Sequence, residues 1–98
     1  MVKHMIIWKL KEEIADQSAV KAAIKEALEG LVGTIDGLLE MHILTEGFDC
    51  SAGDLMMDST LVSREALDAY QKHPAHQAVA NTFVRPHVSQ RLSFDYEI

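Results

Sequence analysis

The first strand is predicted by the alternation of side chains between Val2 and Leu10. One side of an extended chain would carry His4, Ile6, Trp8 and Leu10, and the other side would carry Lys3, Met5, Ile7 and Lys9. A period of two residues is typical of a β-strand. A strand with one face in water would be polar along that whole face, whereas Met5 and Ile7 occupy its middle. We therefore predict that both faces of this strand are covered.

Further strands follow from the same pattern later in the chain. The second is predicted at about Leu38–Leu44 and the third at about Asp54–Val62, with Gly47–Gly53 as the polar loop between them. The fourth strand ends the chain. It carries Leu92, Phe94, Tyr96 and Ile98 on one side, and Arg91, Ser93, Asp95 and Glu97 on the other.

Two helical regions separate these strands. The first has Asp16 as its N-cap and Gly33 as its C-terminal stop, with apolar residues at helical spacing at Val20, Ile24, Ala27, Leu28 and Leu31. The second begins after Ser63 and is interrupted at His73-Pro74, because proline suits the first turn of a new helix. Pro86 then ends that new helix near Val84. His76, Val79 and Phe83 share one face of it.

The resulting order is β-α-β-β-α-β, an α+β ferredoxin-like fold with an antiparallel four-stranded sheet and helices on one face. Residues 1–98 form a single domain, and the other sheet face would expose Met5, Ile7, Leu92, Phe94 and Tyr96. An apolar patch of this kind needs a cover, and a second copy of the chain is the simplest one. We therefore predict a homodimer.

Composition narrows the classes of partner. The net charge of −6 and the pI near 5.2 argue against a nucleic-acid partner, which would need clustered Lys and Arg. No apolar run of about 20 residues and no signal-peptide pattern is present, so we expect no membrane partner. The single cysteine, Cys50, cannot form an internal disulfide and lacks the surroundings of a reactive thiol. The expected compartment is the cytoplasm.

Two motifs carry a family resemblance. Tyr70-Gln71-Lys72-His73-Pro74-Ala75-His76, followed by Phe94-Asp95-Tyr96-Glu97, resembles the stress-responsive A/B barrel domain family, and residues 2–11 and 54–61 resemble its first and third strands. The resemblance implies a dimeric α+β barrel. It also implies a possible activity, because one branch of the family is a cofactor-free polyketide cyclase that closes its substrate by aldol chemistry. That branch has a third-strand histidine where this chain has Leu55.

The candidate site is a pocket between the helices and the sheet. We predict that His4, Ile6, Trp8, Leu55, Met57 and Val79 line it and bind a small apolar molecule, since such sites are mostly apolar with a few convergent polar groups. Tyr70 and His76 match the proton-transfer residues of the cyclase branch, and His4 matches a pocket histidine. As an alternative to binding, Tyr70 and His76 would therefore serve as the catalytic residues of a cofactor-free cyclase or isomerase.

A purely structural role for these residues is the competing interpretation. In it, His73 caps the helix that begins at Pro74, His76 donates a ring N–H to a backbone carbonyl, and Tyr70 keeps its hydroxyl at the rim. Asp58, on the predicted dimer face, would bond to the partner. We predict no metal and no cofactor, because His73 lies outside the helix and no carboxylate or cysteine completes a ligand set with His4, His42, His76 and His87.

Overall fold

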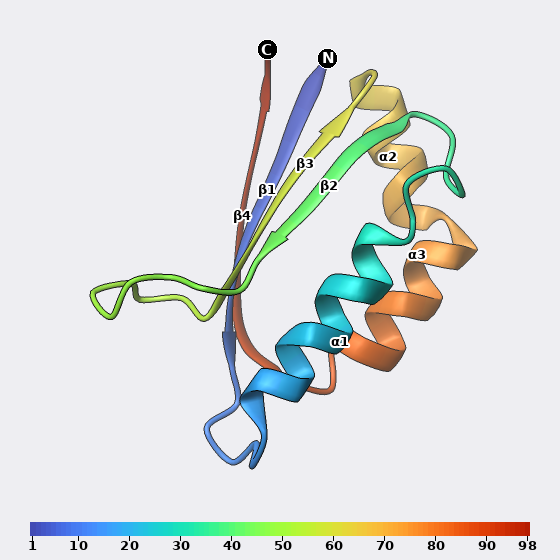
Figure 1. Cartoon of the computed structure of the whole chain (residues 1–98). Coiled ribbons are helices and arrows are strands. Elements are labelled where there is room, and N and C mark those ends of the chain that lie inside the picture. The colour runs from blue at the N-terminus through green and yellow to red at the C-terminus, as the bar shows by residue number, and fades with distance from the viewer.

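The four strands form one antiparallel sheet in the order β2-β3-β1-β4, and all the helices lie on one of its faces (Figure 1). The computed structural model describes residues 1–98. Its elements are β1 Val2–Leu10, α1 Gln17–Glu29, β2 Leu38–Leu44, β3 Leu55–Leu61, α2 Arg64–Lys72, α3 Pro74–Val79, a π-helical segment Ala80–Val84, and β4 Val88–Glu97. This is the predicted ferredoxin-like arrangement. None of the helices combines the length and the apolar character needed to cross a membrane.

The core lies between the sheet and the helices, as the alternation in β1 predicted. Val2, His4, Ile6, Trp8 and Leu10 are all buried. Across the β1–β3 ladder, Ile6 pairs with Met57 and Trp8 with Leu55, so these apolar side chains share the helix-facing side of the sheet. Helix α1 covers them with Ile24 and Leu28, and α2 covers them with Leu67 and Tyr70.

Helix α1 begins as predicted but ends earlier. The Asp16 carboxylate accepts from the backbone N–H of Ala19 at 3.0 Å, which is an N-cap. The helix ends at Glu29 with Gly30 as its C-cap, so the prediction of Gly33 as the stop was wrong. At Leu31 the backbone hydrogen bonds change to the shorter i→i−3 pattern, in which the Leu31 N–H donates to the Leu28 carbonyl at 3.1 Å. Gly33, at φ 89°, belongs to the turn that follows.

The break between α2 and α3 follows the predicted chemistry. His73 has an extended backbone, and its Nδ1 accepts from the backbone N–H of Ala75 at 3.0 Å. Pro74 occupies the first turn of α3. The helical path ends near Val84 as expected. Its last part is a π-helix, however, in which the N–H of Arg85 donates to the carbonyl of Ala80 at 2.8 Å.

No helix covers the other face of the sheet within one chain (Figure 1), and exposed apolar side chains lie on that face. Phe94 and Leu92 are 71% and 72% exposed, and Ile7 and Tyr96 are also exposed. The register places these side chains together, because Phe94 pairs with Met5 and Leu92 with Ile7. Asp58 on this face accepts from the Lys3 ammonium of its own chain at 2.9 Å, and its expected bond to a partner chain stays a prediction.

Candidate functional site: a cavity between helix and sheet

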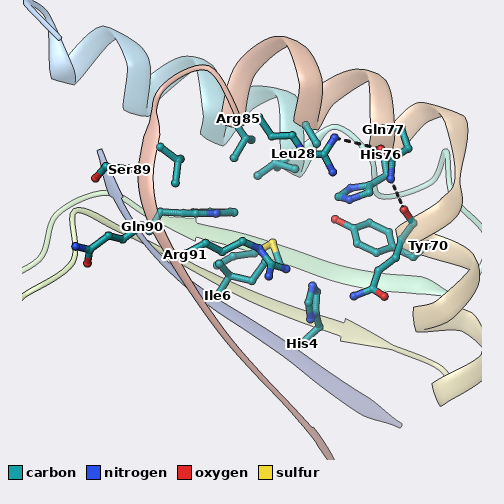
Figure 2. Close-up of a pocket in the computed structure, with 16 residues that line it drawn as sticks. His4, Ile6, Leu28, Tyr70, His76, Gln77, Arg85, Ser89, Gln90 and Arg91 are labelled. Carbon is teal, nitrogen blue, oxygen red and sulfur yellow. Dashed lines mark hydrogen bonds between the residues drawn. The ribbon is translucent and has the colours of Figure 1, made fainter. Parts of the chain in front are cut away.

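A cavity of about 580 Å³ opens between the helical layer and strands β1 and β4 (Figure 2). Half of its 16 lining residues are hydrophobic. Six of the eight residues predicted for the site line it, namely His4, Ile6, Trp8, Met57, Tyr70 and His76. The cavity therefore brings together residues from β1, β3, α2 and α3. Its volume lies within the usual range for small-molecule pockets, about 300 to 1,000 Å³.

Leu55 and Val79 do not line this cavity. Leu55 is buried at the start of β3 opposite Trp8, where it belongs to the core. The cavity-facing stripe of the broken helix runs through His76, Ala80 and Val84, whereas Val79 packs against the core. The sequence placed Leu55 on the helix-facing side of the sheet but could not place it along the strand. It placed Val79 on the same face as His76, whereas the cavity-facing stripe is the neighbouring one.

Tyr70 is fully buried, and its hydroxyl has no hydrogen-bond partner within the protein. The expectation of a hydroxyl at the rim was therefore wrong, and Figure 2 shows it pointing into the cavity. Its ring centroid lies 4.3 Å from that of His76 and 6.2 Å from that of His4. Burial raises the pKa of Tyr70 well above its ordinary value, although the charge of Arg91 acts in the opposite direction. At neutral pH the hydroxyl is a hydrogen-bond donor.

His76 stands beside Tyr70 with its Nδ1 buried and unpaired. The predicted bond to a backbone carbonyl is absent. Burial, with a smaller effect from positive charges that include those of Arg85 and Arg91, lowers the pKa of His76 to about 4. The imidazole is therefore neutral at physiological pH, with one ring nitrogen free to accept a hydrogen bond.

His4 is held by an acidic partner that sequence reasoning did not propose. Its Nδ1 makes a short hydrogen bond with the Asp95 carboxylate, and the two residues face each other across the β1–β4 ladder. His4 is 2% exposed. A carboxylate on one ring nitrogen fixes the orientation of an imidazole. The alternation in the last strand had already placed Asp95 on the helix-facing side, which is the signal that could have identified it.

Two arginines lie at the mouth of the cavity, and sequence reasoning missed both. Arg85 follows the π-helical segment, and Arg91 stands on β4 opposite Trp8. The Arg85 guanidinium donates to the amide oxygens of Gln77, at 3.2 Å, and Asn81. Gln77 in turn donates to the backbone carbonyl of Gln71 at 2.6 Å. The mouth is thus polar where the interior is apolar.

No group of three or more His, Cys, Asp or Glu side chains in the chain is placed to hold a metal ion. The imidazoles of His4 and His76 both reach the cavity, but the nearest carboxylate, that of Asp95, is engaged by His4. His73 is occupied in capping α3. The site is built from hydrogen-bonding groups and apolar walls.

Protein stability is expected to decrease as the pH falls from about 6.5 to about 4 through His76. In this window the unfolded chain binds a proton that the folded protein does not, so acid favours unfolding. Above this window, the lowered pKa of His76 makes its full contribution to the free energy of unfolding. That contribution is on the order of 2 kcal/mol, after a reduction for the partial exposure of the ring. Urea unfolding above and below the window measures it. The non-titrating variant His76→Asn should lose this part, and an unchanged pH dependence in the variant would contradict the assignment.

Comparisons with known proteins agree with this architecture. The family model described as stress responsive A/B barrel domain matches residues 2–98. No curated protein matches the chain. Among solved structures, a dimeric ferredoxin-like protein of unknown function from Bacteroides fragilis is 22% identical, with 99% of this chain and 95% of that chain covered and a TM-score of 0.90.

Two further structures extend the comparison. A dimeric ferredoxin-like protein of unknown function from Jannaschia sp. is 25% identical, with 99% of this chain and 98% of that chain covered and a TM-score of 0.74. The hydroxynitrile lyase from Passiflora edulis is 17% identical, with 99% and 92% covered and a TM-score of 0.81, a likeness of fold alone. With the family model spanning residues 2–98, the chain belongs to the stress-responsive A/B barrel domain family.

Proposed function

We propose that this protein binds a small molecule with an apolar body and a hydrogen-bonding oxygen in the cavity between helices and sheet. The observation that carries the proposal is the pair of buried, unpaired polar atoms, the Tyr70 hydroxyl and His76 Nδ1, in one cavity wall. Buried polar groups are normally hydrogen-bonded, and leaving one unpaired costs about 1 to 3 kcal/mol. A ligand oxygen at this point would remove that cost. Ile6, Trp8 and Leu28 would contact the apolar body.

Two matched probes test this proposal. 6-Hydroxy-2-naphthamide carries an apolar body and a hydroxyl, and 2-naphthamide lacks the hydroxyl. Fluorescence or calorimetric titration should show the hydroxylated probe binding about 3-fold to 10-fold more tightly, the usual value of one hydrogen bond. The preference should disappear in Tyr70→Phe. Equal affinity of the two probes for the native protein would count against the proposal.

A second candidate function is cofactor-free proton transfer, of the lyase, cyclase or isomerase type. It is favoured by the proximity of a protonated Tyr70 and a neutral His76, whose ring centroids lie 4.3 Å apart. The Tyr70 hydroxyl could donate a proton to an enolate, and His76 could accept a carbon-bound proton. One protein of the same fold is named as a hydroxynitrile lyase. However, a pKa of about 4 makes His76 a weak base, since general bases work best with a pKa near the working pH. The low pKa of His76 therefore favours binding over catalysis.

Deuterium exchange separates the two functions. In heavy water, a catalytic site would accelerate exchange at the methyl group of 2-acetonaphthone, as followed by proton NMR. His76→Asn should then lower the accelerated rate by about 10²-fold to 10⁴-fold, the usual contribution of a general base. If the ketone binds but its methyl protons exchange no faster than in buffer, the binding function stands and catalysis of this reaction on the probe is excluded.

We further propose that two chains associate through the apolar sheet face. Exposed side chains of β1 and β4 form a continuous apolar surface there, and such a surface marks an interaction site. The structures from Bacteroides fragilis and Jannaschia sp. are described as dimeric. We also place the protein in the cytoplasm, because its one cysteine, Cys50, is exposed and unpaired, which suits a reducing compartment.

A further inference from the structure

The mouth of the cavity has the opposite charge to the protein as a whole. The chain has 9 Lys and Arg residues against 15 Asp and Glu, which gives a net charge of −6. Yet Arg85 and Arg91 both line the cavity. In Figure 2 both side chains extend from opposite walls toward Tyr70 and His76. Two cations therefore converge on one opening of an acidic protein.

Neither guanidinium has an acidic partner. Arg85 donates only to the neutral amide oxygens of Gln77 and Asn81. The ion pairs of the protein involve the amino terminus, Lys3, His4, Lys25, His42 and Arg64. Two carboxylates lie on the same side of β4 as Arg91: Asp95 is bonded to His4, and Glu97 lies 3.8 Å from the amino terminus. The charge of the two arginines is therefore free to act on a ligand.

The charges that act on the cavity interior agree with this geometry. Burial is the largest cause of the lowered pKa of His76, and the positive charges of Arg85 and Arg91 act in the same direction. Arg91 also acts on Tyr70 in the direction that favours a negative oxygen. A positive potential at this site favours an anion over a neutral molecule of the same shape.

We infer that the cavity mouth is a carboxylate subsite and that the ligand of this protein is a small carboxylic acid. Its carboxylate would lie between Arg85 and Arg91, its apolar body against Ile6 and Trp8, and its second oxygen at Tyr70. Guanidinium groups suit this role because they offer paired donors that match the two oxygens of a carboxylate. The inference rests on the proposed binding function and adds the charge of the ligand to it.

The test compares an acid with its neutral amide. 6-Hydroxy-2-naphthoate and 6-hydroxy-2-naphthamide share the ring system and the hydroxyl and differ in charge. We expect the acid to bind about tenfold more tightly than the amide, as a charge-assisted hydrogen bond would provide at a solvent-accessible mouth. Its affinity should fall as sodium chloride is raised, while that of the amide should not change.

Two variants assign the preference to the mouth. Arg91→Gln with Arg85→Gln should reduce the acid-to-amide ratio to about one, because the affinity for the acid should fall much further than the affinity for the amide. Arg64→Gln removes a distant exposed arginine that is paired with Asp68, and it should keep the full ratio. Because Arg85 and Arg91 are exposed, their replacement does not endanger the fold.

The outcomes separate this inference from the binding function. If acid and amide bind native protein equally well, the carboxylate subsite is refuted and the binding function stands. An acid preference that survives in the double arginine variant refutes the subsite as well. If neither probe binds at millimolar concentration, the binding function fails and the subsite fails with it.

Discussion

Phenylalanine at position 70 is expected to make the protein more stable while it weakens ligand binding. The Tyr70 hydroxyl is buried and unpaired, so removing it abolishes a desolvation cost and leaves the packed ring in place. The expected gain is about 1 kcal/mol, or several degrees in melting temperature for a domain of this size. Thermal unfolding of the ligand-free protein measures it. Opposite signs for stability and binding are typical of a group retained for function.

The chain offers a matched control in its other tyrosine. Tyr96 lies on the open sheet face with an exposed side chain, so Tyr96→Phe should change the free energy of unfolding by no more than about 0.5 kcal/mol. A lower melting temperature for Tyr70→Phe would show that the hydroxyl stabilises the native state. In that case the buried hydroxyl would no longer indicate a ligand oxygen at this position.

The second large effect is expected on the assembly. Native protein should have a solution mass of twice 10.9 kDa by light scattering, and Phe94→Asp should have the mass of a single chain. Phe94 is 71% exposed and lies opposite Met5 within the apolar sheet face. In a symmetric dimer the substitution would bury two unpaired carboxylates, at a cost of several kcal/mol.

A control for the assembly lies on the other side of the molecule. Val32 is exposed in the turn after α1, so Val32→Asp should remain dimeric. A native protein that scatters as a monomer at micromolar concentration would refute the dimer outright. If Phe94→Asp remains dimeric, the interface must lie on another surface of the protein.

The fold could be predicted because its signals are local. The two-residue period of Val2–Leu10 maps directly onto the buried and exposed faces of β1. Asp16, Ser63 and Pro74 begin helices through bonds or dihedral angles that span a few residues. Gly33 misled the prediction because two glycines follow α1 closely, and only hydrogen bonding decides which one caps it.

The site was predicted less completely because its polar features depend on tertiary register. Whether the Tyr70 hydroxyl and His76 Nδ1 find partners depends on what lies across the cavity, which no local pattern specifies. Asp95 meets His4 only through the pairing of β1 with β4. Arg85 and Arg91 converge from elements on opposite sides of the opening. The alternation of the last strand gave the side of the sheet on which Asp95 and Arg91 lie, but it did not give their neighbours.

The π-helical segment Ala80–Val84 lies next to the cavity and contains one residue more than an α-helical path would need. Its closing bond, from Arg85 N–H to the Ala80 carbonyl, spans one residue more than an α-helical bond. Loss of the exposed Thr82 would let the same stretch close as an α-turn, with Pro86 and β4 entering the sheet as before. The loss of one residue can therefore be absorbed here without a change of register. Tyr70 and His76 precede this segment, so such a deletion would shorten the path from them to Arg85 and leave both in place.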